Sequence, residues 1–197
     1  MEQNCKVNPF SFTIFASCTS SMDADQLAAD IPNPDRFLIA HPFQPVHLQP
    51  LVELVGCKAT SPSTLRRAKA LMDSLHRQTI ILNHSVPGFI VNRLAQALYR
   101  ECIDLIERGV AEPADIDRAV RYAVGMRYAS IGLLEYFDAV GYELEAAIAG
   151  NIYPTLCNAR SVQQLVADGI AFGKTGQKAR QGLNIGSLEG RHLSASG

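Results

Sequence analysis

The hydrophobic pattern of this chain changes near residue 85, and the change limits the folds that it can adopt. Before that point, short apolar runs alternate with helical segments, whereas every later apolar segment repeats with the period of a helix. Alternating strands and helices predict an α/β layer, and consecutive helices predict an all-α domain. We therefore expect two domains, 1–85 and 86–197.

The first part is predicted to hold four strands, because it contains four short runs rich in β-branched or aromatic residues. The expected strands are 12–16, 36–40, 51–55 and 78–82. Asp23 is a candidate cap for a short helix, and Ser61 followed by Pro62 begins a longer one that continues to about Arg77. We expect the first strand to be buried.

The second part is predicted to be a cluster of helices. From Phe89 to Arg108 a broad apolar stripe favours a long helix that buries much of its circumference. Further helices are expected at 112–124, 131–139, 142–149 and 161–167. Because so small a helical domain leaves apolar area uncovered, we expect a homodimer. The tail, Gly190 to Gly197, is expected to be disordered.

Composition excludes several classes of protein. The chain is 47% hydrophobic and 19% charged, an ordinary globular composition. Its 18 basic and 19 acidic residues nearly cancel, so the sequence predicts no basic surface for nucleic acid or an anionic membrane. The five cysteines are odd in number and lack C-x-x-C, which argues against disulfides and a metal site. The balanced charge favours a small-molecule ligand or a protein partner. Without a signal peptide or an apolar span, we expect a soluble cytoplasmic protein.

His41 and Glu53 are the first candidates for chemistry. A histidine at a strand end can exchange a proton near neutral pH, although such a histidine taken alone is more often structural or exposed. Glu53 lies within an apolar run, and a buried carboxylate needs a partner. A carboxylate bound to an imidazole would fix its tautomer; the alternative is a glutamate on the solvent side of an edge strand.

Three motifs stand in order along the chain: Cys18-Thr19-Ser20-Ser21, His41-Pro42-Phe43-Gln44-Pro45, and Pro87 to Arg93. Together with Glu53 they resemble the 3-hydroxyacyl-CoA dehydrogenase family, over residues 12 to 185. The resemblance implies the remnant of a Rossmann domain followed by an all-α dimerisation domain, like the C-terminal domain of 6-phosphogluconate dehydrogenase. It also implies NAD-dependent oxidation of an L-3-hydroxyacyl-CoA, or of a free 3-hydroxy acid, to the 3-oxo compound.

The resemblance assigns roles to four residues. His41 is the base and Glu53 its orienting carboxylate; Ser20 binds the substrate oxygen near the nicotinamide, and Asn92 orients the substrate from the first long helix. Both Ser20 and Asn92 would donate hydrogen bonds to an oxygen on which charge develops. Read without the family, a helix cap is the favoured interpretation of Ser20, and an exposed polar residue on a helix is that of Asn92.

The segment Gly125 to Ala129 is similar to the branch of the family that contains lambda-crystallin, gulonate dehydrogenase and carnitine dehydrogenase. Arg127 would then pair with a substrate carboxylate, although a surface arginine is as good an interpretation. Two positions depart from the family pattern: Gln44 replaces an asparagine and Leu133 a proline. Phe172 to Gly176 resembles a C-terminal signature, for which a structural turn is favoured over a phosphate contact.

The glycine-rich fingerprint of a dinucleotide site is absent from this chain. All 14 glycines lie from Gly56 onward and no two are separated by a single residue, so G-x-G does not occur. We expect a truncated enzyme that lacks most of its cofactor domain and has little activity alone. The alternative is a non-catalytic dimerising or binding remnant of such a dehydrogenase. The choices between CoA thioester and free acid, and between NAD and NADP, stay open.

Overall fold

The computed structural model describes residues 12–183. The chain divides into two compact units, Met1–Ala95 and Gln96–Gly197. The predicted boundary at residue 85 stays a prediction, and the predicted tail lies outside the described residues.

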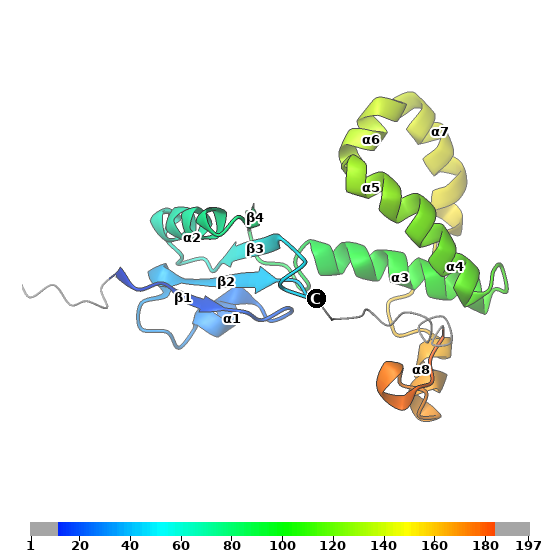
Figure 1. The fold of residues 1–197 in the computed structure, drawn as a ribbon, viewed down its shortest axis with the longest axis horizontal. Helices are drawn as coiled ribbons and strands as arrows, with labels where there is room; N and C mark the ends of the chain where they lie inside the picture. Colours follow the sequence, from blue (N-terminus) through cyan, green and yellow to red (C-terminus); the bar gives the residue numbers. More distant parts are fainter. Residues whose placement is uncertain (1–11, 184–197) are drawn as a thin grey trace, which may run out of the picture. The chain divides into compact units, whose positions relative to one another are not determined.

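The first unit is an α/β layer (Figure 1). Its elements are β1 (Phe15–Ser17), α1 (Ala24–Ala28), the 3₁₀ turn η2 (Pro34–Arg36), β2 (Phe37–Pro42), β3 (Leu51–Gly56), α2 (Pro62–Ser74) and β4 (Gln78–Leu82). The strands form one mixed sheet in the order β1-β2-β3-β4. β1 is parallel to β2 and β3 is parallel to β4, whereas β2 and β3 are antiparallel.

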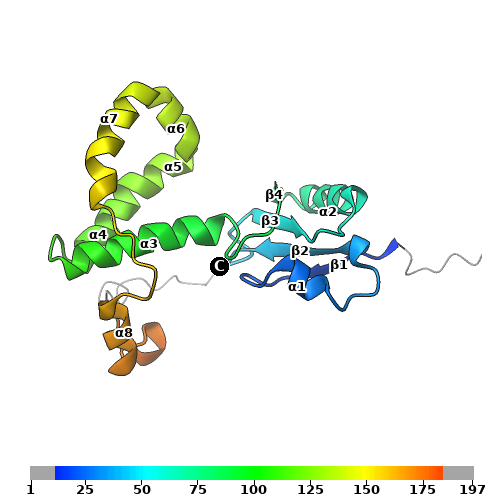
Figure 2. The same ribbon diagram turned by 180° about the vertical axis from the view of Figure 1, so that it is seen from behind.

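Helices cover both faces of this sheet, with α1 on one side and α2 on the other (Figures 1 and 2). Alternation along β2 supplies both faces. Phe37 and Ile39 pack with Ala24 of α1, whereas Leu38 and Ala40 pack with Ala68 of α2. A strand that is covered on both faces reads as a continuous apolar run, which is why the sequence identified it.

Both predicted helix starts are confirmed. Asp23 caps α1 by accepting hydrogen bonds from the Asp25 and Gln26 N–H groups. The bond from Gln26 is the main reason that the pKa of Asp23 lies below its usual value. Ser61 caps α2 by accepting from the Thr64 N–H, and Pro62 occupies the first turn, where its missing donor costs nothing.

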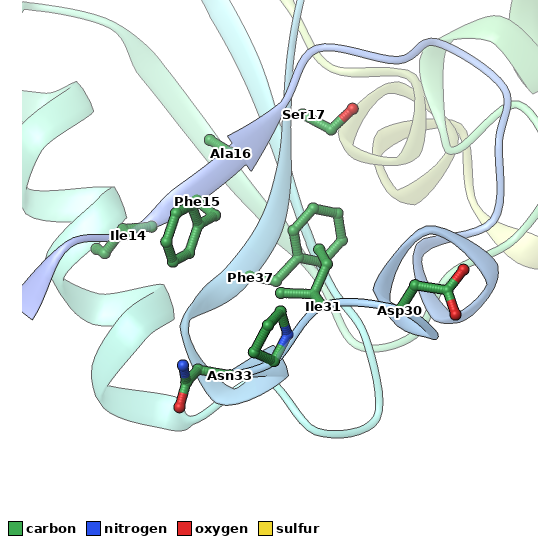
Figure 3. A pocket seen from close by; sticks show the side chains of 9 residues that line it. Ile14, Phe15, Ala16, Ser17, Asp30, Ile31, Asn33 and Phe37 are labelled. Atoms are coloured by element: carbon green, nitrogen blue, oxygen red, sulfur yellow. The ribbon is translucent and has the colours of Figure 1, made fainter. Parts of the chain in front are cut away.

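The prediction that the first strand is buried is wrong. β1 is only three residues long, begins at Phe15 and leaves the Phe15 side chain 45% exposed. One edge of β1 pairs with β2, and among the described strands none pairs with its other edge. Beside it lies a hollow of about 550 Å³, lined by Phe15, Ile31 and Phe37 among others (Figure 3). The unpaired edge of β1 presents free backbone groups to which another strand can bind.

The second unit is helical. Its elements are α3 (Val91–Glu107), which begins in the first unit, α4 (Pro113–Ala119), the π-helix η3 (Val120–Gly125), α5 (Met126–Ser130), α6 (Leu133–Val140), α7 (Tyr142–Ile152), the 3₁₀ turn η4 (Tyr153–Thr155), α8 (Gln164–Ala171) and the 3₁₀ turn η5 (Gln177–Ala179). The one helix predicted over 112–124 is α4 continued by the π-helix. Within residues 12–183, no helix is both long and apolar enough to cross a membrane.

This second unit has little core of its own. Of its described apolar side chains, only Ile103 is buried, at 1% exposure. The prediction that α3 buries much of its circumference is therefore wrong for a single chain: Leu94, Leu98 and Tyr99 are all exposed. The apolar stripe is present, but the chain does not cover it.

Candidate active site

The central contact of the site joins His41 to Glu53. The two residues stand directly opposite each other in the antiparallel pairing of β2 with β3, so their side chains share one face of the sheet. His41 Nδ1 lies 2.8 Å from Glu53 Oε2, and the two residues are 5% and 0% exposed. The sequence indicated that this carboxylate needs a partner, and the register of the two strands supplies one.

The second oxygen of Glu53 is bound by backbone. Oε1 accepts hydrogen bonds from the Ile90 and Val91 N–H groups, each at 3.0 Å, where α3 begins. Helix N-termini present unpaired N–H groups and favour negative charge. The two backbone donors at Oε1 and the start of α3 therefore favour negative charge on this carboxylate.

The tautomer of His41 follows from the charge of Glu53. An ionised carboxylate only accepts hydrogen bonds, so the Nδ1 atom that faces Glu53 carries a hydrogen. In the neutral ring Nε2 is then unprotonated, and it is the nitrogen that can take up a proton. Aromatic rings flank the imidazole, with the centroid of Phe43 at 4.5 Å and that of Phe89 at 5.5 Å.

A shallow pocket of about 500 Å³ opens beside His41. Its lining consists of Cys18, Ser20, His41, Pro42, Phe43, Gln44 and Asn92. Ser20 follows β1 and His41 ends β2, so the pocket lies at the carboxyl ends of two parallel strands, the position at which open α/β sheets bind ligands. The structure thus brings Ser20, His41 and Asn92 to one place.

Ser20 and Asn92 are also connected directly. Asn92 Nδ2 donates a hydrogen bond to the Ser20 carbonyl oxygen at 3.2 Å. The alternative that Ser20 caps a helix is wrong, because Asp23 is the cap of α1. Asn92 is only partly exposed, on the first turn of α3. Their predicted roles toward a substrate remain predictions.

Arg127 lies in the second unit, on α5. Its guanidinium stacks at 4.5 Å from the centroid of the Tyr136 ring, a contact that restrains a flexible side chain without using its N–H donors. The helix that carries it follows the π-helix η3, and such irregular turns are frequent at functional sites. Its predicted role in binding a carboxylate remains a prediction.

The segment Phe172 to Gly176 ends α8. The Lys174 N–H donates to the Gly169 carbonyl at 2.7 Å, and Gly173 has the positive φ that such a turn needs. Leu133, at the family's proline position, is the first residue of α6, and the N–H of the preceding N-cap residue Gly132 donates to the Glu135 carboxylate. Among residues 12–183, no cluster of three histidine, cysteine or acidic side chains could hold a metal ion.

Sequence reasoning missed three features of the site. It assigned nothing to Phe89 or to the Ile90 and Val91 N–H groups, although Pro87-Gly88 ahead of a predicted helix is a signal for a turn. It also passed over Cys18, which lies exposed in the pocket. Backbone donors carry no signal in the identity of their residues, so only the fold could reveal them.

Two protein-family models match most of this chain. Residues 4–85 match the NAD binding domain of 3-hydroxyacyl-CoA dehydrogenase, and residues 88–185 match the C-terminal domain of the same enzyme. The chain belongs to the 3-hydroxyacyl-CoA dehydrogenase family. Its fold class, an α/β Rossmann part followed by a helical domain, is thereby confirmed.

Two relatives show how similar this chain is to known enzymes and how much of their length it covers. The chain is 32% identical over 171 residues to 5-formyl-3-hydroxy-2-methylpyridine 4-carboxylate 5-dehydrogenase of Mesorhizobium japonicum, covering 87% of this chain and 55% of the relative. It is 37% identical over 131 residues to L-carnitine dehydrogenase of Oceanobacillus iheyensis, covering 66% and 43%. The chain thus spans about half the length of these relatives.

A solved structure is similar to most of this chain. A crystal structure of 5-formyl-3-hydroxy-2-methylpyridine 4-carboxylic acid 5-dehydrogenase, an NAD⁺-dependent dismutase, superposes with a TM-score of 0.85 at 30% identity. The match covers 90% of this chain and 60% of that one. The likeness extends over both units of this family member.

Replacing Glu53 by glutamine should invert the His41 tautomer. The amide oxygen can still accept from the Ile90 and Val91 N–H groups, but the amide NH₂ then faces Nδ1, which must become the acceptor. We expect ¹⁵N NMR of the histidine side chains to show Nδ1–H in the parent and Nε2–H in Glu53→Gln. Loss of the bond to a charged group should also lower the free energy of unfolding by about 1.5–3 kcal/mol.

Asp73→Asn is the matched control, because Asp73 is an exposed carboxylate of the same unit that pairs with Lys69. It should leave the His41 signal unchanged. An Nε2–H tautomer in the parent protein would contradict the geometry described here.

Proposed function

We propose that this chain forms the substrate side of an NAD-dependent dehydrogenase that oxidises an L-3-hydroxyacyl-CoA, or a free 3-hydroxy acid, to the 3-oxo compound. The observation that carries the proposal is the buried Glu53 bound to His41 Nδ1, which leaves Nε2 as the proton acceptor at a polar pocket. Because the chain spans about half the length of its relatives, the proposal concerns the activity of the whole enzyme.

Each residue has a distinct task in this reaction. His41 Nε2 takes the proton of the substrate hydroxyl, and Glu53 stabilises the imidazolium that results. Ser20 and Asn92 donate hydrogen bonds that hold the substrate oxygen in place. The cofactor NAD, when bound, accepts the hydride that leaves the substrate carbon bearing that hydroxyl group.

The residues present fit only one end of that cofactor. Ser20 follows a parallel strand at its carboxyl end, where a nicotinamide ring and substrate can meet. The chain has no G-x-G with which backbone could cradle a pyrophosphate. The alternative is a non-catalytic remnant of such a dehydrogenase that dimerises or binds, for which the edge of β1 that no described strand pairs is available.

Titration of the chain with NADH, followed by assay with NAD and candidate substrates, separates the two proposals. The substrates to compare are a 3-hydroxyacyl-CoA, L-carnitine and 5-formyl-3-hydroxy-2-methylpyridine 4-carboxylate, the compound in the name of the Mesorhizobium japonicum relative. Saturable NADH binding with turnover would support the dehydrogenase. Absence of NADH binding by the chain alone, with no turnover when a separate cofactor-domain polypeptide is added, would support the non-catalytic remnant.

His41→Ala should lower kcat by roughly 10²–10⁴-fold, the usual contribution of a general base. NADH affinity should stay unchanged, because the substitution removes only the proton acceptor. His84→Ala, at an exposed histidine beyond the end of β4, is the control and should keep full activity. A His41→Ala protein with unchanged kcat would rule out the assigned base.

We propose further that Arg127 binds the carboxylate of a free-acid substrate. Arg127→Ala should raise KM for L-carnitine by roughly 10- to 100-fold, since bonds to charged groups contribute about 1.5–3 kcal/mol. The matched control is Arg121→Ala, which removes another stacked arginine, at 5.7 Å from the Tyr122 ring centroid. Equal KM values in both variants would show that Arg127 is a surface residue.

We also propose a homodimer in the cytoplasm, formed through the helical unit. Leu134, Tyr142 and Phe172 are 77%, 73% and 75% exposed, an apolar surface that suits a second copy. Sedimentation velocity should show a dimer, and Leu134→Asp should shift it toward monomer. Leu48→Asp, at a 68% exposed leucine of the first unit, should not. A monomeric parent protein would contradict the proposal.

A further inference from the structure

The turn that precedes α3 has an unusual backbone at Phe89. Gly88 and Phe89 both have positive φ, at 77° and 50°, and the Phe89 N–H donates to the Val86 carbonyl at 3.0 Å. Glycine adopts this left-handed conformation freely, but for phenylalanine it is unfavourable. Such a conformation persists only where the surrounding structure imposes it, and it is found preferentially at functional sites.

The side chain of Phe89 explains why the turn persists. The residue is 0% exposed and is the largest fully buried one of the described chain. It packs in the core cluster that includes Phe37 and Ile39 of β2 and Val55 of β3. Releasing the turn would withdraw this ring from the core, so burial of the ring offsets the cost of the backbone conformation.

The conformation of the turn has a direct effect on Glu53. Immediately after Phe89, the N–H groups of Ile90 and Val91 both point at Glu53 Oε1. Successive N–H groups that follow a left-handed residue form a concave site for an anion. The carboxylate is thus held by a backbone arrangement that exists only while Phe89 keeps its place.

The same ring also contacts the other half of the pair. Phe89 meets the His41 imidazole edge-on, with centroids 5.5 Å apart and planes at 61°, and Phe43 meets it at 4.5 Å. The imidazole is therefore restrained by rings as well as by its bond to Glu53 Oε2. Phe89 is therefore linked to both partners: its ring contacts the His41 imidazole, and the N–H groups that follow it bind Glu53.

We propose that Phe89 is a positioning residue that sets the geometry of the His41–Glu53 pair: its buried ring keeps the left-handed turn, and the turn holds Glu53. The inference rests on the proposed function only in giving that pair a catalytic purpose. The alternative is that Phe89 is a core residue like any other.

The test replaces Phe89 by leucine or by methionine, which keep an apolar side chain but remove the ring. Both should make the Ile90 and Val91 amides exchange with deuterium faster by roughly tenfold or more, as loss of about one hydrogen bond implies. Both should also broaden or shift the His41 Nδ1–H resonance. Neither readout needs activity, so an inactive chain would refute the proposed function without affecting this result.

Phe37→Leu is the matched control, because Phe37 is another buried phenylalanine of the same core cluster, and no ring contact links it to His41. It should lower the melting temperature to a similar degree while leaving the His41 resonance and the two amides as in the parent. Equal effects of Phe37→Leu and Phe89→Leu on those readouts would overturn the proposal.

The parent protein provides a test that needs no variant. The Ile90 and Val91 amides should be strongly protected from exchange, unlike first-turn amides that are bonded only to water. Rapid exchange of both in the parent would overturn the proposal, because the turn would then not hold Glu53.

Discussion

The carboxylate of Glu53 is the group on which the first unit depends. A buried ion is costly unless its oxygens are bound, and here three N–H groups from two different segments converge on it. One comes from the neighbouring strand through His41, and two come from the start of α3. Sheet register, the turn before α3 and the tautomer of the histidine are therefore not independent, since each is needed to satisfy the same charge.

The sheet shows how that convergence is built from simple parts. β2 and β3 are apolar on both faces because α1 covers one face and α2 the other. Within such strands a polar side chain is accepted only where a partner stands opposite, and the antiparallel pairing places His41 opposite Glu53. Slipping the pairing by one residue would turn the two side chains to opposite faces and leave a buried charge unpaired.

The second unit differs from the first in how little of its apolar surface is buried. Its helices have apolar stripes of the expected period, but with Ile103 as the only buried apolar side chain of its described part, they do not close a core within one chain. Most helical stability in proteins comes from packing of an apolar face. The proposed homodimer would cover such an exposed apolar surface.

The sequence by itself determined the kinds of element and their order. Runs of β-branched residues located β2, β3 and β4, caps at Asp23 and Ser61 located two helix starts, and the motifs around His41 and Asn92 identified the family. These signals are local, because they depend on residues that are neighbours along the chain. They failed where burial depends on other segments, as at exposed Phe15 of β1 and along α3.

Only the tertiary structure decided how the site works. That Glu53 binds backbone at Ile90 and Val91, that Phe89 takes a left-handed turn, and that Asn92 reaches Ser20 all depend on contacts between residues far apart in sequence. Backbone N–H groups are the same in every residue except proline, so no letter of the sequence marks the ones that will bind a charge. Their position is fixed by packing, and packing exists only in the folded chain.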